Sequence, residues 1–217
     1  MPRGRAASYD TTREAILEQA SRLFAERGYP ATSMNEVAEA CRIRKPTLYH
    51  YVRDKYELLV LIADGHVSRL QALVDDVKAE RLAPEPHLRR LIGRFVEAYA
   101  DARAHHRVLT EDVRFLNEAD RERLRTAQRR VVVAFADAIH AVQPSTTPLE
   151  KPLAMLLFGM INWMFTWLQP DGALTHEEMA PVVADLFFGG IAAVRPPKPR
   201  RRGRRNEMPH TQKETLA

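Results

Sequence analysis

The fold of this chain is decided by residues 32–55, which read Thr32-Ser-Met-Asn-Glu-Val-Ala-Glu-Ala-Cys-Arg-Ile-Arg-Lys-Pro-Thr-Leu-Tyr-His-Tyr-Val-Arg-Asp-Lys55. Ser33 and Glu36 have the spacing of a capping box, which predicts that a short helix begins there. Pro46 suits the first turn of a second short helix, because the first N–H groups of a helix have no partner within it. Two short helices joined by a tight turn over 41–44 are typical of a helix-turn-helix.

Longer helices are expected on both sides of this motif. Before it, a capping pattern at Thr11 and Glu14 precedes apolar residues at helical spacing, which predicts a helix over 11–27. After it, an amphipathic run predicts a helix over 54–81 that ends before Pro84. This second helix would join a small N-terminal unit to the remainder of the chain.

The segments beyond Pro84 also have helical length and spacing, and none shows the alternation of a strand. The chain is therefore predicted to be all-α, with about nine helices divided between an N-terminal three-helix helix-turn-helix domain and a C-terminal helical domain. The further helices are expected over 87–105, 107–116, 121–142, 149–168 and 177–194.

Basic residues gather at the two ends of the chain. Of a net charge of +5 at pH 7, seven positive charges fall within 195–205, whereas residues 57–194 carry −4. A basic segment attracts an anionic partner, so the ends are where such a partner is expected. The predicted organisation is a basic N-terminal arm (1–10), a helix-turn-helix domain (11–56), a second helical domain (57–194) and a basic disordered tail (195–217).

Several locations and contacts are disfavoured by the residues present. The single cysteine, Cys41, cannot form an intramolecular disulfide, and residues 1–10 lack the apolar stretch of a signal peptide, so a cytoplasmic location is expected. The longest apolar run, 152–168, is too short for a membrane span and contains Asn162 and Thr166. It is interpreted as a buried helix, and no membrane partner is expected.

Signatures of catalysis and cofactor binding are missing from the sequence. It has no glycine-rich phosphate loop, serine nucleophile motif or paired-carboxylate signature, so the chain is predicted not to be an enzyme and to need no cofactor. His105 and His106 are adjacent, and neighbouring side chains on a helix point about 100° apart, so no metal site is expected there.

The second short helix carries groups suited to DNA. A helix in the major groove faces the base edges with its N-terminal residues, which here are Arg44, Lys45, Thr47 and Tyr49. Cationic and hydroxyl groups bind guanine edges and phosphates. Double-stranded DNA is therefore the predicted partner of this segment.

The same segment resembles the DNA-reading motif of the TetR family of bacterial transcriptional regulators. The resemblance extends over residues 11–60 and rests on a capped Val-Ala helix, then Thr-Leu-Tyr and a further aromatic residue before a lysine. It implies a homodimer that reads a palindromic operator. The matching residues are Thr32, Val37, Ala38, Thr47, Leu48, Tyr49, Tyr51 and Lys55.

The resemblance also implies a role for individual side chains. Thr47 and His50 would reach bases or nearby phosphates, and Tyr49 would pack on the sugar-phosphate backbone. Lys55 would meet a phosphate at the N-terminus of its helix. The side chains expected in the core instead are Cys41, Leu48, Tyr51 and Val52.

Two basic features near the motif have alternative interpretations. Arg42 stands in the turn where the family often has glycine, and positive φ disfavours a non-glycine residue by about 1 kcal/mol. Either this turn has another shape, or Arg42 is tolerated for a phosphate contact. Arg3 and Arg5 are candidates for the adjacent minor groove, with a merely flexible arm as the alternative.

The last two predicted helices point to a dimer and a ligand. The first of them is apolar nearly all round, so it is expected to bury one face in its own domain and another in a second copy. Residues 158–178 resemble the C-terminal signature of TetR members that sense acyl-CoA thioesters. This implies that Asn162, Trp163 and Trp167 border a ligand tunnel or the dimer seam. Thr166 stands where family members often have an arginine, so one CoA phosphate partner is missing.

The function expected from these features is a ligand-responsive repressor. It would bind a palindromic operator as a homodimer through its last two helices and release it when a small hydrophobic effector, for which an acyl-CoA is one candidate, binds the C-terminal domain. One alternative is a multidrug or natural-product sensor of the same fold. Another is a helical interaction protein or enzyme with a degenerate helix-turn-helix.

Overall fold

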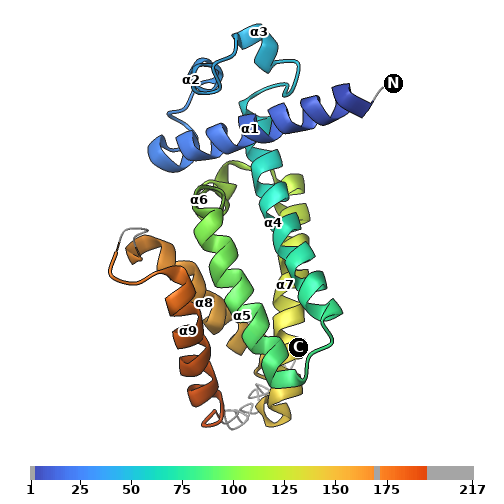
Figure 1. Ribbon diagram of the computed structural model, residues 1–217, viewed down its shortest axis with the longest axis vertical. Helices are drawn as coiled ribbons and strands as arrows, with labels where there is room; N and C mark the ends of the chain where they lie inside the picture. Colours follow the sequence, from blue (N-terminus) through green and yellow to red (C-terminus); the bar gives the residue numbers. More distant parts are fainter. Residues whose placement is uncertain (1–2, 169–171, 195–217) are drawn as a thin grey trace, which may run out of the picture.

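The computed structural model describes residues 3–168 and 172–194, and within those ranges every regular element is helical. Nine α-helices lie there, which confirms the predicted all-α fold (Figure 1). None of them is long and apolar enough to cross a membrane. The helices are α1 (Arg3–Arg27), α2 (Met34–Ala40), α3 (Lys45–Leu48), α4 (Lys55–Ala79), α5 (Pro84–Asp101), α6 (Arg103–Glu111), α7 (Glu118–Val142), α8 (Glu150–Trp167) and α9 (His176–Ile191), with 3₁₀ turns at Val113–Phe115 and Pro144–Thr146.

Helix α1 begins earlier than predicted. It starts at Arg3, so the capping pattern at Thr11 is not used and the backbone before it is helical rather than an extended arm. The residues after Pro2 are mostly good helix formers, and Gly4 alone costs too little to stop the helix. The side chains of Arg3 and Arg5 lie outside the described residues, as does the predicted tail over 195–217.

Local sequence sets the other helix starts. The Ser33 hydroxyl accepts from the N–H of Glu36 at 3.3 Å, and the Glu36 carboxylate accepts from the N–H of Ser33 at 2.7 Å, which confirms the capping box. Asp54 caps α4 by accepting from the N–H of Glu57 at 2.7 Å. Helix α5 begins at Pro84, earlier than predicted, because proline is favoured in the first helical turn.

The helices form an elongated molecule with a small unit at one end. Figure 1 shows α1 running across the ends of α4 and α6, with α2 and α3 on its far side and the other helices below. Helices α5 and α7 pack beside α4, and α8 and α9 pack on α7 and α5. The short helices α2 and α3 are thus held away from the main bundle.

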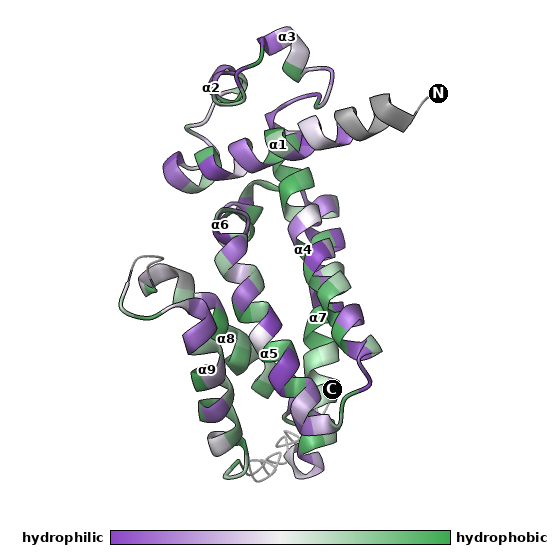
Figure 2. Cartoon of the chain, in the orientation of Figure 1, coloured by the Kyte–Doolittle hydropathy of each residue, from purple (hydrophilic) through white to green (hydrophobic). Residues whose placement is uncertain are grey.

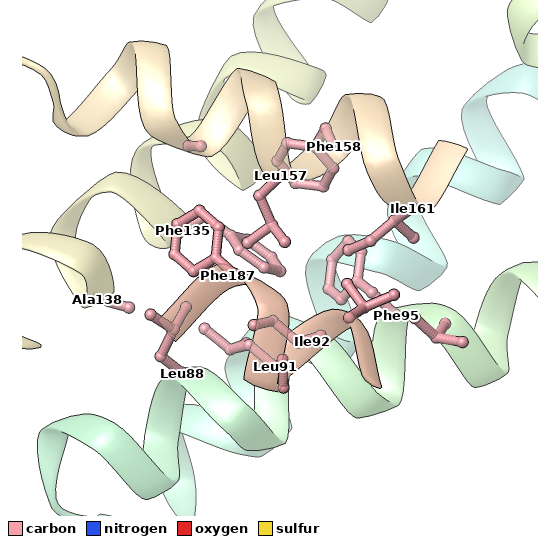
Figure 3. Packing of buried hydrophobic residues seen from close by; sticks show 14 of the residues in the cluster. Leu88, Leu91, Ile92, Phe95, Phe135, Ala138, Leu157, Phe158, Ile161 and Phe187 are labelled. Carbon is pink, nitrogen blue, oxygen red and sulfur yellow. The ribbon is translucent and has the colours of Figure 1, made fainter. Parts of the chain in front are cut away.

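An aromatic core holds the lower bundle together. Phe95 of α5 packs edge-on against Phe135 of α7, with ring centroids 4.8 Å apart, and both contact Phe158 of α8. Figure 3 shows these rings converging with Leu91 and Phe187 from α5 and α9. Truncation of a fully buried phenylalanine typically costs about 3–5 kcal/mol, so this cluster fixes how the four helices meet.

A second core joins the small unit to the bundle. Ile16 and Phe24 of α1 are buried with Leu58 from the first half of α4 and with Val108 and Leu124 from α6 and α7. The second half of α4 belongs to the lower core. The predicted domain boundary at residue 56 therefore falls at the start of a helix that both cores share.

The turn between α2 and α3 has the backbone shape that glycine prefers. Arg42 has φ +54°, and the N–H of Ile43 reaches back to the carbonyl of Ala38 at 3.0 Å, which ends α2 with a left-handed residue. The alternative that this turn has another shape is therefore wrong. The Arg42 side chain is exposed, so the strained backbone holds a free cation at the surface.

Replacing Arg42 with glycine should stabilise the protein. The left-handed conformation costs a non-glycine residue about 1–2 kcal/mol, which exceeds the entropy that glycine adds to the unfolded chain, so R42G should raise the free energy of unfolding by roughly 1 kcal/mol. Urea denaturation measures this change. Arg44 has φ −75°, so R44G is the matched control and should lower stability. A loss of stability in R42G would show that the arginine side chain makes a stabilising contact.

Candidate nucleic-acid interface and ligand cavity

Helix α3 presents its polar side chains outward and its apolar side chains inward. Leu48 and Val52 are buried, as predicted, and hold the helix on the core of the small unit. Thr47 is half-buried, whereas Tyr49 is 45% exposed. The remaining predicted DNA-binding residues of the turn and helix are also exposed: Arg42, Arg44, Lys45 and His50. This surface combines cations, hydroxyl groups and an aromatic ring along a short helix and its two ends, which is the chemistry that DNA grooves and phosphates accept.

Helix α1 supports the end of this surface through a contact that the sequence analysis missed. Tyr9 stacks on Tyr51 with ring centroids 4.7 Å apart, and its hydroxyl donates to the backbone carbonyl of His50 at 3.3 Å. Tyr51 is half-buried by this stacking and by the core. The partners are about 40 residues apart in sequence, so no local spacing signals the pair. Cys41 is also half-buried, and burial raises the pKa of its thiol.

Lys55 is engaged within the protein rather than free for a phosphate. Its ammonium donates to the backbone carbonyls of Tyr29 at 2.9 Å, Pro30 at 3.2 Å and Thr32 at 2.8 Å. It also lies 4.6 Å from the centroid of the Tyr29 ring. An ammonium has three N–H donors, and all three are used here. The prediction that Lys55 contacts a phosphate is therefore corrected. Lys55 instead connects the loop between α1 and α2 to the first turn of α4.

A cavity of about 210 Å³ lies among α4, α5, α6, α7 and α8. Asn162 lines it, and its Oδ1 is buried without a hydrogen-bond partner in the described part of the chain. No residue that lines the cavity carries a formal charge at neutral pH. The lining residues are Val67, Leu70, Tyr99, His106, Leu109, Thr110, Gln128, Val131, Val132, Met155, Phe158 and Asn162.

Two larger hollows have charged walls. One, of about 590 Å³, lies between α4 and α7 and includes Lys78 and Arg130. The other, of about 840 Å³, lies where α1 meets α4 and α5 and includes Arg69 and Asp76. The uncharged cavity is the one suited to an apolar guest, because burial of an unpaired charge is costly.

The two tryptophans lie outside this cavity. Trp163 is 67% exposed and Trp167 is 50% exposed, and neither lines the cavity, so of the two predicted positions, a ligand tunnel or a dimer seam, their exposure favours the seam. Leu156 of α8 and Leu186 of α9 are also exposed, at 66% each. Figure 2 colours much of α8 and α9 as hydrophobic. Such an exposed apolar surface is typical of an interface with another protein.

Three histidines lie where the small unit meets the bundle. The ring of His66 on α4 lies 5.6 Å from that of His106 and 6.4 Å from that of His105, measured between centroids. His106 stacks on Tyr99 at 4.0 Å, while His105 Nδ1 lies 3.4 Å from the hydroxyl of Ser21 on α1. The rings therefore form a continuous buried contact from the cavity wall to α1. The described residues contain no group of three or more suitable ligands that could hold a metal ion.

Burial keeps these histidines neutral. Desolvation lowers the pKa of His66 to about 3 and that of His106 to about 4, and it also lowers the pKa of His105. Arg69 adds to the effect on His66 and His105 because a nearby cation disfavours a second positive charge. The three histidine rings at the junction are therefore uncharged near neutral pH.

Acid should destabilise the fold through these histidines. An unfolded histidine binds a proton near pH 6.5, whereas folded His66 binds one near pH 3, so stability is full above pH 6.5 and falls as the pH drops toward the folded value. Between pH 7 and pH 5 the protonation of His66 and that of His106 should each remove about 2 kcal/mol from the free energy of unfolding. Urea titrations at pH 7 and pH 5 measure the fall in the free energy of unfolding between the two pH values. This fall should be smaller in H66L than in the wild type, whereas H50Q, changed at an exposed position, should show the same fall as the wild type. An equal loss in H66L would contradict the assignment.

Comparison with known protein families gives two matches along the chain. Residues 16–62 match the family described as bacterial regulatory proteins of the tetR family. Residues 81–191 match the tetracyclin repressor-like C-terminal domain. The first match contains α2, α3 and the start of α4. The second contains α5, α6, α7 and α8, which surround the uncharged cavity together with α4.

Individual proteins resemble the chain over most of its length. The transcriptional repressor KstR2 of Mycobacterium tuberculosis H37Rv is 25% identical over 197 residues, which cover 86% of this chain and 96% of the relative. A TetR-family regulator from Bordetella parapertussis has a TM-score of 0.77 at 31% identity, covering 84% of this chain and 96% of that one. AibR, solved with isovaleryl coenzyme A and operator DNA, has a TM-score of 0.71 at 27% identity, covering 81% and 97%.

Proposed function

The chain belongs to the TetR family of bacterial regulatory proteins, and on that premise we propose that it represses transcription as a homodimer that binds a palindromic operator and releases it when an acyl-CoA binds. The family consists of non-enzymatic DNA-binding regulators, so the prediction that the chain is not an enzyme is confirmed. Membership of this family also argues against the alternative of a helical interaction protein or enzyme with a degenerate helix-turn-helix. Because the operator lies on the chromosome, we place the protein in the cytoplasm.

The outward surface of α3 is the observation that carries this proposal. Lys45 is exposed on α3, Arg44, Tyr49 and His50 are exposed beside its two ends, and Leu48 anchors the helix to the core. A helix held in this way can enter the major groove with its side chains free, and two copies on a two-fold axis would read two half-sites. Arg42 would add a phosphate contact from the preceding turn, and the basic tail, which lies outside the described residues, would add nonspecific ones.

Loss of two side chains on and next to α3 should weaken operator binding. Thr47→Ala together with Tyr49→Ala removes two proposed contacts, each worth about 1–3 kcal/mol, so affinity should fall at least tenfold. The assay is a fluorescence-anisotropy titration with a duplex selected by the wild-type protein from a random pool, at fixed salt. R129A, at an exposed position on α7, is the control and should bind as the wild type does. Undiminished binding by the double variant would refute the assignment of α3 as the reading helix.

The exposed apolar residues of α8 and α9 support a homodimer through these two helices. Leu156, Trp163 and Leu186 are each about two-thirds exposed, which would leave costly apolar area in water in a single copy. Two antiparallel pairs related by a two-fold axis would form a four-helix interface. In this arrangement Trp163 and Trp167 would lie at the dimer seam, where the partner subunit would bury their rings.

A charge in this face should separate the subunits. Leu186→Glu would place a carboxylate in an apolar interface, where it has no partner, so sedimentation should show a monomer with weakened operator binding. Val133 of α7 is 40% exposed outside this face, so V133E is the matched control and should remain a dimer. A dimeric L186E protein would place the interface elsewhere.

The uncharged cavity favours a neutral apolar group as the part of the effector that is buried. A cationic drug would require a carboxylate, and none lines the cavity, so the multidrug alternative has less support. AibR, which has the same fold, was solved with isovaleryl coenzyme A, a thioester with a small branched acyl group. Position 166 is a threonine, where family members often have an arginine that could bind a CoA phosphate, so other residues would have to bind the nucleotide part of CoA.

Binding of an acyl-CoA should raise the melting temperature. A ligand at about 100 times its Kd stabilises the folded state by about 2.7 kcal/mol, which thermal denaturation readily detects. Acyl-CoAs of graded length should be compared with their free acids and with cationic drugs. Stabilisation by thioesters alone is the expected result. Stabilisation by drugs alone would overturn the effector assignment and leave the DNA-binding proposal intact.

A further inference from the structure

The wall of the uncharged cavity is mostly apolar but also carries several polar side chains. Tyr99, His106, Thr110, Gln128 and Asn162 contribute polar side chains to its wall. We propose that the effector's acyl group is short and carries a hydroxyl that hydrogen-bonds Asn162. This inference rests on the proposed acyl-CoA function and narrows its ligand to hydroxyacyl thioesters.

The size of the cavity limits the length of the acyl group. At about 30 Å³ for a water-sized group, 210 Å³ accommodates about seven non-hydrogen atoms. A four-carbon hydroxyacyl group has roughly six such atoms, including its carbonyl oxygen, and fits. By the same measure, long fatty chains and steroid ring systems, with about 16 or more carbon atoms, need at least roughly twice this volume.

Asn162 supplies the specific evidence for a hydroxyl. Its Oδ1 is buried and accepts no hydrogen bond from the described residues, although a buried acceptor without a donor is costly. The side chain also lines the cavity, so a ligand that enters could supply the missing donor. A hydroxyl is neutral and can donate, which suits a wall that carries no formal charge.

The neighbouring polar groups are suited to the same hydroxyl. The Thr110 hydroxyl donates its proton within α6, where the backbone carbonyl of His106 lies 3.1 Å away and that of Arg107 lies 3.0 Å away. Because this proton is used, the hydroxyl oxygen can only accept a hydrogen bond from a ligand. Burial raises the pKa of Tyr99, so its phenol stays protonated. The apolar part of the wall, including Val131 and Phe158, would contact the carbon atoms.

The test compares two thioesters that differ by one group. Isovaleryl-CoA carries a methyl group where 3-hydroxybutyryl-CoA carries a hydroxyl, so their acyl groups have nearly the same shape. Calorimetric titration of the full chain with isovaleryl-CoA and with each 3-hydroxybutyryl enantiomer gives the ratio of their Kd values. We expect one enantiomer to bind at least tenfold more tightly than isovaleryl-CoA, because a site built around a hydroxyl leaves a polar group unpaired when the ligand lacks it.

Two variants test whether Asn162 causes the preference for 3-hydroxybutyryl-CoA over isovaleryl-CoA. Asn162→Leu keeps the shape of the side chain and removes the acceptor, so the preference should vanish while isovaleryl-CoA binds at least as tightly as before. Met155→Leu also changes the lining but removes no polar group, so the preference should persist.

The possible results are distinguishable. Equal or tighter binding of isovaleryl-CoA by the wild-type protein would overturn the hydroxyacyl inference and leave the acyl-CoA proposal standing. An undiminished preference in N162L would overturn the role of Asn162. Failure of the wild-type protein to bind any CoA thioester would overturn both proposals.

Discussion

Helix α4 is buried in two different hydrophobic cores, and the arrangement of the protein depends on this. Its first half, with Leu58 and Ile62, packs against α1, whereas its second half, with Leu73 and Val77, packs within the lower bundle. A helix of 25 residues is about 37 Å long and stiff. Because Lys55 anchors the first turn of α4 to the loop before α2, a tilt of α4 in the bundle would also move the small unit that carries α3.

The histidine contacts beside α4 give the cavity a second mechanical connection to α1. His106 lies in the cavity wall, and the adjacent His105 approaches Ser21 of α1, so α6 touches both the ligand space and the DNA-binding unit. A guest that displaces His106 would also move His105. An effector shifts the conformational equilibrium only through its difference in affinity for the two states, and this connection is where such a difference would arise in our proposal.

Much of the candidate DNA surface was predictable because its signals are local. A capping box and a proline in the first turn fix where α2 and α3 begin, and alternating exposure along α3 follows from helical periodicity. The roles of Lys55 and Tyr9 were not predictable in this way. Lys55 resembles a DNA-contacting residue in sequence, but its partners lie 23–26 residues away, and Tyr9 pairs across an even longer separation.

The amino-acid sequence by itself determined the helices, the all-α class and the reading motif, because caps, helix breakers and apolar periodicity act over only a few residues. Tertiary structure decided which side chains meet. It placed Asn162 in a cavity and Trp163 and Trp167 on the outer surface, although all three lie on one helix, because the packing of α8 on α7 selects which face is enclosed. It also placed Arg42 at positive φ, where the closure of a turn outweighs the local preference of the residue.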